Sequence, residues 1–289
     1  MAQLTRTKRG WDNEHLATFL LSQISFIANP IKVADDIGSD LFCTIFEARA
    51  IKRVDLLFPR NSFAIQIKSR ATPIRATNKI EYLVGLEVPF FVGIVDRGKL
   101  QLSIHSGEYL PVMFSRGHPR GLTLVPTAPG VVSSALCEGN PSGGNWRLLL
   151  PHVCDVSPYD TAEALRETAE RMSRRCQRIH GNISARANKE YIFSHDDEDQ
   201  KYEILAGPSS VQTFRRNFCL RLAEVFANFE WMLNWRGDRH PQLDSGEDAE
   251  FQLYNRLYKD LALQSADLPW ILHDRYEAAA RAYRGKMKS

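Results

Sequence analysis

The sequence lacks the short motifs that most often announce an enzyme site. It has no GxxxxGKS/T phosphate loop, no GxGxxG dinucleotide turn, no GxSxG elbow and no HExxH zinc helix. Its five cysteines are scattered without CxxC pairs, and its eight histidines show no ligand spacing. These absences exclude P-loop hydrolases, zinc-finger frameworks and disulfide scaffolds. Buried thiols in a reducing compartment are the simpler interpretation of the cysteines.

Long hydrophobic runs are also missing. The most apolar early stretch, residues 16–28, is interrupted by polar side chains and is shorter than the ~20 residues that a membrane span needs. The basic start is not followed by the apolar core of a signal peptide. We therefore expect a cytoplasmic protein that does not enter a membrane. With 44% hydrophobic residues, 25% charged residues and a net charge of +3, the 289-residue chain should form a sizeable core.

The first third of the chain alternates helical and strand patterns. Apolar residues recur at helical spacing before Pro30, and later runs are rich in residues that favour strands. The predicted elements are a helix over residues 11–30, strands over 40–46 and 63–69, a helix over 76–86, and a strand pair over 90–95 and 100–104.

The remainder changes character near Ser157. Before it, short apolar runs alternate with loops rich in Gly, Pro and Ser; after it the pattern is helical, with the strongest apolar stripe over residues 209–236. That stripe fits a helical core, or a surface for a second copy or a partner protein. The predicted fold class is α/β (α+β), a mixed sheet flanked by helices plus a helical C-terminal domain. The predicted domains are 1–107, a β-rich linking region 108–156, and 157–289.

One strand carries side chains that are unusual for a sheet interior. Because strand side chains alternate, the apolar residues of 63–69 share one face, whereas Gln66 and Lys68 share the other. A lysine in an apolar central strand is costly to desolvate, so it usually has a charged partner or a function. At a strand edge its ammonium group could instead reach water.

Carboxylates that could accompany this strand precede it in the chain. Asp40 follows a Gly-Ser turn at the head of the preceding strand, and antiparallel pairing would bring it near Gln66 and Lys68. Glu14, on the first helix, could approach from the side. Each has an ordinary alternative, Asp40 as a turn residue and Glu14 as a first-turn carboxylate that the helix dipole favours. The acidic pair at 35–36 could supply a carboxylate instead.

Together these residues resemble the motif of the PD-(D/E)XK, or restriction-endonuclease-like, nuclease superfamily. The resemblance rests on Glu14, on the GxD sequence that ends in Asp40, and on the QxKS sequence of residues 66–69. It looks most like the DUF4365 branch, which carries a GxD strand followed by a QxKS strand, and it covers residues 10–105. The commoner motif of the superfamily has Glu or Asp in place of Gln66.

The resemblance implies a metal-dependent endonuclease that hydrolyses phosphodiester bonds, in DNA rather than RNA, with a role in bacterial defence against foreign DNA. The expected cofactor is Mg²⁺, which takes hard oxygen ligands in octahedral geometry and which Mn²⁺ could replace. Its ligands would be Asp40, the side-chain carbonyl of Gln66, the main-chain carbonyl of Ile67, and Glu14. Lys68 would orient the attacking water and stabilise charge on the phosphate.

The charge along this part of the chain fits a polyanionic substrate. Between residues 49 and 79 the one acidic residue is Asp55, and basic residues recur throughout. Such a cluster neutralises phosphates, although a solvated basic face has the same sequence pattern. The expected substrate contacts are Arg49, Lys52, Arg53, Arg60, Arg70, Arg75 and Lys79.

Two other functions remain open. With Gln66 in place of an acid, the chain could be a nuclease fold that binds nucleic acid without cutting it. The long C-terminal helices could instead belong to an assembly protein. The first would bind nucleic acid equally well in Mg²⁺ and in EDTA, and the second would show no salt-dependent affinity for nucleic acid.

Overall fold

A computed structural model describes residues 2–28, 38–51, 54–130, 137–138, 144–195, 202–207, 210–236, 245–264 and 268–287. The chain forms two compact units. The first comprises Met1–Ala187 and Tyr191–Ala206, and the second comprises Asn188–Glu190 and Gly207–Ser289.

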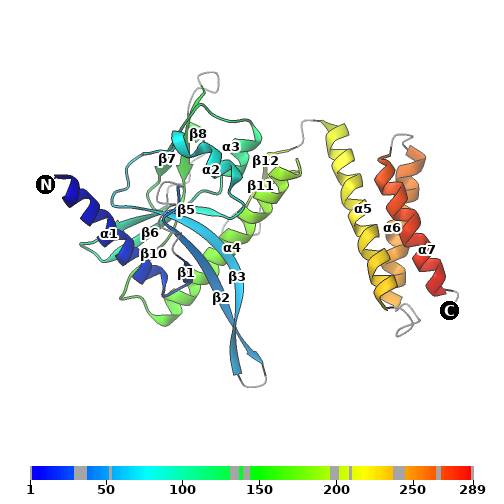
Figure 1. Ribbon diagram of the computed structural model, residues 1–289, viewed down its shortest axis with the longest axis horizontal. Coiled ribbons are helices and arrows are strands. Elements are labelled where there is room, and N and C mark those ends of the chain that lie inside the picture. Colours follow the sequence, from blue (N-terminus) through cyan, green and yellow to red (C-terminus); the bar gives the residue numbers. More distant parts are fainter. Residues whose placement is uncertain are drawn as a thin grey trace. The chain divides into compact units, whose positions relative to one another are not determined.

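A six-stranded sheet forms the centre of the first unit, with the strand order β1-β2-β3-β5-β6-β10 (Figure 1). The central pair β3 and β5 is parallel, and the other neighbours are antiparallel. Parallel neighbours need a crossover, and the segment between β3 and β5 provides it. The strands are β1 (Phe26–Ala28), β2 (Leu41–Ile51), β3 (Val54–Lys68), β5 (Phe90–Asp96), β6 (Gln101–Ser106) and β10 (His152–Val156).

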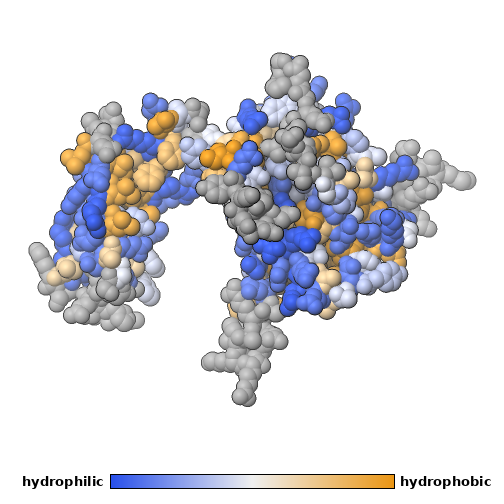
Figure 2. All heavy atoms as spheres, turned by 180° about the vertical axis from the view of Figure 1, so that it is seen from behind, coloured by the Kyte–Doolittle hydropathy of each residue, from blue (hydrophilic) through white to orange (hydrophobic). Residues whose placement is uncertain are grey.

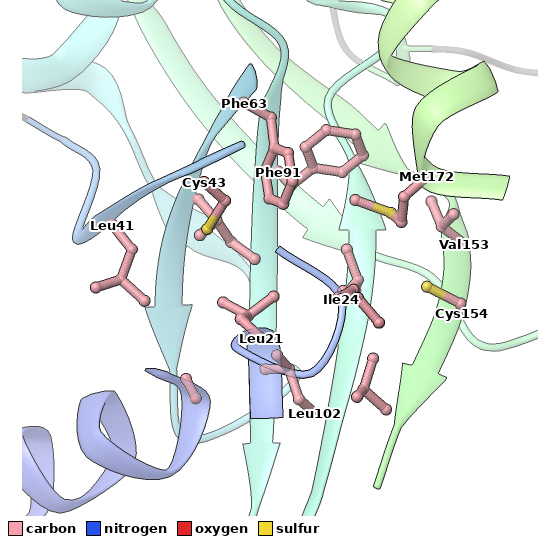
Figure 3. Packing of buried hydrophobic residues seen from close by; sticks show 14 of the residues in the cluster. Leu21, Ile24, Leu41, Cys43, Phe63, Phe91, Leu102, Val153, Cys154 and Met172 are labelled. Atoms are coloured by element: carbon pink, nitrogen blue, oxygen red, sulfur yellow. The ribbon is translucent and has the colours of Figure 1, made fainter. Parts of the chain in front are cut away.

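Helices α1 (Ala2–Leu21) and α4 (Ala162–Ala187) cover one face of this sheet. Figure 3 shows side chains from the sheet, from α1 and from α4 meeting in one cluster, which includes Phe63 next to Phe91. These two rings are 5.2 Å apart at 73°, an edge-to-face contact. Each such buried side chain contributes about 1.5–3 kcal/mol, so this face anchors the sheet.

The other face packs against two short helices and a second sheet of order β4-β7-β9-β8. Ile80 and Leu83 pack there beside Val92 of the central sheet. The elements are α2 (Ile80–Gly85), preceded by the 3₁₀ turn η2 (Thr77–Lys79), α3 (Leu110–Ser115), β4 (Ile74–Arg75), β7 (Gly121–Pro126), β8 (Cys137–Glu138) and β9 (Asn145–Leu150).

Strands β2 and β3 extend well beyond the sheet. Strand β1 pairs with β2 as far as Thr44, and β5 pairs with β3 from Ala64 onward. From Ile45 and Asn61 outward, the two strands continue as a two-stranded ribbon that projects from the body of the unit (Figure 1). The β2–β3 hairpin therefore has one end in the body of the unit and one end away from it, and charged residues at the two ends lie far apart.

A small hairpin closes the first unit. Strands β11 (Ile192–His195) and β12 (Tyr202–Ala206) pair antiparallel. The side-chain amide of Asn182 on α4 makes two hydrogen bonds with the main chain of Phe193, donating to its carbonyl at 2.6 Å and accepting from its N–H at 3.0 Å. This paired contact fixes β11 to the end of α4.

The second unit consists of α5 (Val211–Arg236), α6 (Ser245–Gln264) and α7 (Trp270–Met287). Its core is aromatic, with Phe226 packing against α6 and α7 and with Tyr258 and Tyr276 stacked at 3.8 Å. Apolar side chains also form a strip along these helices on the face seen in Figure 2. The predicted C-terminal helical region is confirmed, as is the mixed α/β class. No helix among the described residues is long and apolar enough to cross a membrane.

The predicted domain limits at 107 and 156 are wrong. Strand β10 is the sixth strand of the central sheet, and Met172, Cys176 and Ile179 of α4 enter its core. The predicted linking region therefore belongs to the first unit, and the second consists of Gly207–Ser289 with the short segment Asn188–Glu190. An apolar helix face shows that a helix is buried, but its sequence does not show against which core.

Helix limits also differ from the sequence prediction, and α1 begins at Ala2 rather than near residue 11. The first helix ends at Leu21, and residues 26–28 form β1 rather than a further helical turn. The hydroxyl of Ser25 binds the carbonyl of Leu21 at 3.0 Å, a local bond that competes with helix continuation. Helix α4 begins at Ala162 rather than near Ser157, because Thr161 accepts the N–H of Ala164 and serves as its cap.

Candidate functional site

The carboxylate of Asp40 lies against β3. The N–H of Asp40 donates to the carbonyl of Ile65 at 2.9 Å, which continues the β2–β3 ladder by one step. The next N–H of β3 on that side, that of Ile67, donates to Oδ2 of Asp40 at 2.5 Å. A side-chain oxygen thus takes the place of the next backbone carbonyl, and the ladder ends in a carboxylate held at the QxK sequence.

Gly38 shapes the turn that delivers Asp40. Its φ is +122°, a conformation that residues with a side chain rarely adopt. A Cβ at this position would lie 2.7 Å from a ring carbon of Tyr82, so the space is also closed. Ser39, which is buried, accepts a hydrogen bond from the Tyr82 hydroxyl at 2.7 Å. The glycine of the GxD sequence is therefore required by backbone conformation and by close packing.

Gln66 and Lys68 occupy the face of β3 that the alternation predicts. Phe63, Ile65 and Ile67 enter the core beneath α1 and α4. On the opposite face, Gln66 and Lys68 are half-buried and lie level with Val92 and Ile94 of β5. Within the part of the chain that the structure describes, neither side chain makes a hydrogen bond or an ion pair. Partly desolvated polar groups of this kind are what a binding site presents to a ligand.

Asp40 also influences Tyr82 electrostatically. Burial raises the pKa of Tyr82, the hydrogen bond with Ser39 lowers it in part, and the nearby negative charge of Asp40 adds a smaller increase. The phenol is therefore neutral at physiological pH and remains a hydrogen-bond donor.

The predicted basic contacts divide into two groups. Lys79, just before α2, lies beside the turn, because a Cβ on Gly38 would be 3.5 Å from its Cδ. Arg70 follows Lys68 by two residues and is exposed. Arg75 is exposed on β4, where it pairs with Thr123 of β7. These three cations follow β3 in the chain, and Lys79 and Arg70 lie at the same end of the strand as Asp40.

The expected single cluster around Asp40 is wrong for Arg49 and Arg60. Both lie on the projecting ribbon, at the end of the strands remote from Asp40 and Lys68. At about 3.3 Å per residue, nine residues of β2 separate Arg49 from Asp40 by about 30 Å. Arg60 forms a 3.8 Å ion pair with Glu47.

The reason for this error is geometric. A sequence window shows how close charges are along the chain, but an extended hairpin sends neighbouring charges away from the sheet. Lys52 and Arg53 lie outside the described residues.

Glu14 lies at the same end of the sheet but over the other face. Its neighbour Asn13 accepts the Nε–H of Arg97 at 2.6 Å, and Asp12 pairs with Arg97 at 3.1 Å. Because Arg97 directly follows β5, this turn of α1 sits at the carboxyl end of the parallel strands. Glu14 is exposed there, and its role as a ligand stays a prediction. The acidic pair at 35–36 lies outside the described residues.

The described residues contain no group of three or more His, Cys, Asp or Glu side chains arranged to hold a metal ion. The predicted ligands are of a different kind, since Asp40 would be accompanied by an amide and a main-chain carbonyl. In an extended strand the N–H and C=O of one residue point to the same side, so the carbonyl of Ile67 is directed to the side on which its N–H binds Asp40. One carboxylate and neutral oxygens fit Mg²⁺, which keeps several waters.

A second polar cluster on this face was not predicted. His105 and His152 have ring centroids 5.5 Å apart, and Nε2 of His152 lies 3.0 Å from Oδ1 of Asp155. The strand register places Ser103 and Asp155 in one row with Lys68 and Ile94.

The electrostatics of this cluster follow from its burial. Burial and the charge of His152 lower the pKa of His105 to about 4. Burial raises the pKa of Asp155, but hydrogen bonds from Ser103 and His152 outweigh it and hold that pKa below its usual value. These groups are far apart in the sequence, so only the register reveals that they lie on one face.

Comparison with known proteins gave no match: no family model, no curated protein and no solved structure is detectably similar to this chain.

Proposed function

We propose that the chain is a metal-dependent nuclease of the PD-(D/E)XK type, acting on DNA, with Asp40, Gln66 and Lys68 as its site. The observation that carries this proposal is the carboxylate of Asp40 held on the N–H of Ile67, beside Gln66 and Lys68 on one half-buried face. The resemblance to the DUF4365 branch supports it, since the GxD and QxKS residues that carry the resemblance are the ones that meet.

The residues would divide the work as follows. Asp40, the side-chain oxygen of Gln66 and the carbonyl of Ile67 would hold Mg²⁺ or Mn²⁺. When bound, the cation polarises a phosphoryl oxygen and lowers the pKa of a coordinated water. Lys68 would place its ammonium group against the scissile phosphate, orient the attacking water and stabilise the negative charge that develops.

Positive charge close to this end of the sheet would hold the substrate backbone. Lys79 and Arg70 would contact phosphates near the cleaved bond, and Arg75 on the adjoining sheet would extend the contact. Contacts of this kind fix the register of a nucleic acid but do not read its sequence. A role in defence against foreign DNA is part of the proposal and rests on the resemblance.

The test is cleavage of supercoiled plasmid and of single-stranded DNA and RNA in Mg²⁺, Mn²⁺ or EDTA. Asp40→Asn and Lys68→Ala should each lower the cleavage rate about 100-fold or more, as loss of a group that stabilises transition-state charge does. Lys99→Ala, an exposed lysine in the β5–β6 turn, is the matched control and should cut normally. Cutting that persists in both site variants would disprove the assignment.

A second function is favoured by Gln66, which supplies one negative charge fewer than the common motif. The chain would then bind DNA without cutting it. Equal affinity in Mg²⁺ and EDTA, with no cleavage by the native protein and gain of cleavage in Gln66→Glu, would support this alternative against the first.

A further inference from the structure

Helix α2 contacts the turn that carries Asp40 through Tyr82. The helix is fixed to the sheet by Ile80 and Leu83, which pack beside Val92. Tyr82 is half-buried and points from this anchored helix onto the Gly38–Asp40 turn, where its hydroxyl donates to Ser39 at 2.7 Å.

The ring of Tyr82 makes a second, independent contact. Two of its carbons lie 2.7 and 3.0 Å from the position that a Cβ on Gly38 would occupy. The ring therefore packs directly over the glycine backbone. A hydroxyl contact at residue 39 and a ring contact at residue 38 restrain two consecutive residues from one side chain.

Asp40 comes next in the chain and is restrained from the opposite direction. Its carboxylate accepts the N–H of Ile67 on β3. The aspartate thus lies between a strand that holds its side chain and a helix that holds its backbone turn. The N–H of Asp40 is itself tied to the carbonyl of Ile65, so a shift of the preceding turn would be taken up at the carboxylate and would lengthen the Asp40–Ile67 bond.

We propose that Tyr82 is a positioning residue for Asp40: its ring and hydroxyl fix the Gly38–Ser39 turn so that the carboxylate stays on the N–H of Ile67 in the orientation that a metal ion requires. This inference rests on the proposed nuclease site. Groups that orient a metal ligand affect affinity without touching the metal, and a carboxylate displaced by about 0.5 Å is enough to weaken a site.

The contact can be followed in protein free of metal. The amide of Ile67 can be observed by NMR in [¹⁵N]isoleucine-labelled protein, and its signal can be assigned from the peak that disappears in Ile67→Val. In Tyr82→Phe, which loses the hydroxyl alone, hydrogen exchange at the Ile67 amide should become about fivefold faster, the value of one neutral hydrogen bond. Tyr82→Leu, which also loses the ring, should produce a larger increase.

Metal affinity provides the second readout. The Mn²⁺ concentration for half-saturation, measured by calorimetry, should rise in the order native, Tyr82→Phe, Tyr82→Leu. Tyr109→Phe is the matched control, since the hydroxyl of Tyr109 hydrogen-bonds to Glu108 and Ser194, neither of which belongs to the Gly38–Asp40 turn. It removes the same group from the same unit, and it should leave the Ile67 amide and the Mn²⁺ affinity unchanged.

The two proposals fail in different ways. Native protein that neither binds Mn²⁺ nor cuts DNA would contradict the nuclease proposal, and the Ile67 exchange rates would still report on Tyr82. An Ile67 amide that exchanges at the native rate in Tyr82→Leu, in protein that remains folded, would overturn the positioning role. An effect of equal size in Tyr109→Phe would also overturn it, because it would show a general loosening.

Discussion

Asp40 accepts the backbone N–H of Ile67, the middle residue of the Gln-Ile-Lys sequence, with a distance of 2.5 Å between Oδ2 and the amide nitrogen. The contact joins two residues that are 27 positions apart in the sequence, and it depends on how the strands that follow and carry them are paired. Antiparallel pairing of β2 and β3 puts the start of one strand beside the end of the other. A carboxylate on the first strand and an amide and amine on the second then meet at one end of the sheet.

We expect Gly38→Ala to destabilise the first unit and to weaken the Asp40 contact. The backbone conformation at φ +122° costs a residue with a Cβ about 1–3 kcal/mol, and the Tyr82 ring occupies the space that the methyl group needs. Chemical denaturation followed by circular dichroism measures the loss. In the double variant Gly38→Ala/Tyr82→Leu, the stability lost to the clash with the ring should be recovered. The stability lost to the strained backbone conformation should not be.

Equal stability losses in the single and double variants would show that the ring is not the obstacle. Gly117→Ala is a useful comparison, since Gly117 also has a positive φ, +131°, but no atom lies within 4 Å of its Cβ position. It should show the conformational cost alone.

The stability of the first unit should fall on acidification between about pH 6.5 and pH 4. Burial lowers the pKa of His105 to about 4, below its ordinary value near 6.5, so in this window the unfolded chain binds a proton that the folded chain does not. Stability therefore rises with pH through this window. The effect is at most about 3 kcal/mol, which is the free energy that a lowering of the His105 pKa from 6.5 to about 4 corresponds to.

His105→Gln should flatten this pH dependence when unfolding is measured at several pH values. The groups that face His105 are His152 and Asp155, whose own lowered pKa adds an acid-dependent loss below pH 4. The exposed His118 provides the control, since His118→Gln should leave the curve unchanged. A pH profile that keeps its slope without His105 would refute this assignment.

Buried thiols should resist modification in the native protein. Cys43, Cys154, Cys176 and Cys219 are buried, and burial raises the pKa of Cys43 and Cys154 to about 12. Since the thiolate is the reactive form, these groups are inert at neutral pH. A disulfide reagent should therefore react with fewer cysteines in the native protein than the five that react in denaturant. Rapid reaction of all five would mean that the core opens easily.

Sequence patterns predicted the parts of this structure that depend on neighbouring residues. The alternation over residues 63–69 gave the face of Gln66 and Lys68, and the predicted strand pair over residues 90–95 and 100–104 gave the β5–β6 hairpin. Antiparallel pairing gave the approach of Asp40. Each inference needed only the geometry of one strand or one turn.

Long-range packing could not be predicted in this way. Nothing in the sequence of α2 shows that Tyr82 reaches Ser39, and nothing near β10 shows that it completes the sheet. The ribbon illustrates the limit most directly, because Arg49 is close to Lys68 in sequence and remote in space. Contacts of that kind depend on which core each element joins.

The two units should respond separately to core substitutions. Phe63 and Phe226 are both fully buried, the first under α1 and α4 and the second among the aromatic residues of α5, α6 and α7. Replacing either with Ala removes contacts and leaves a cavity, at a cost of about 3–5 kcal/mol. Because the units have separate cores, Phe63→Ala should lower the stability of residues 1–187 and Phe226→Ala that of residues 207–289.

Hydrogen exchange followed by mass spectrometry distinguishes the two cases, because each peptide reports the opening of its own unit. In Phe226→Ala, faster exchange should be confined to α5, α6 and α7, while peptides from β3 and β5 keep their native rates. Phe63→Ala should give the reverse pattern. If either variant accelerates exchange in both units equally, the chain unfolds as one cooperative body, and the helical unit then contributes to the stability of the sheet that carries Asp40.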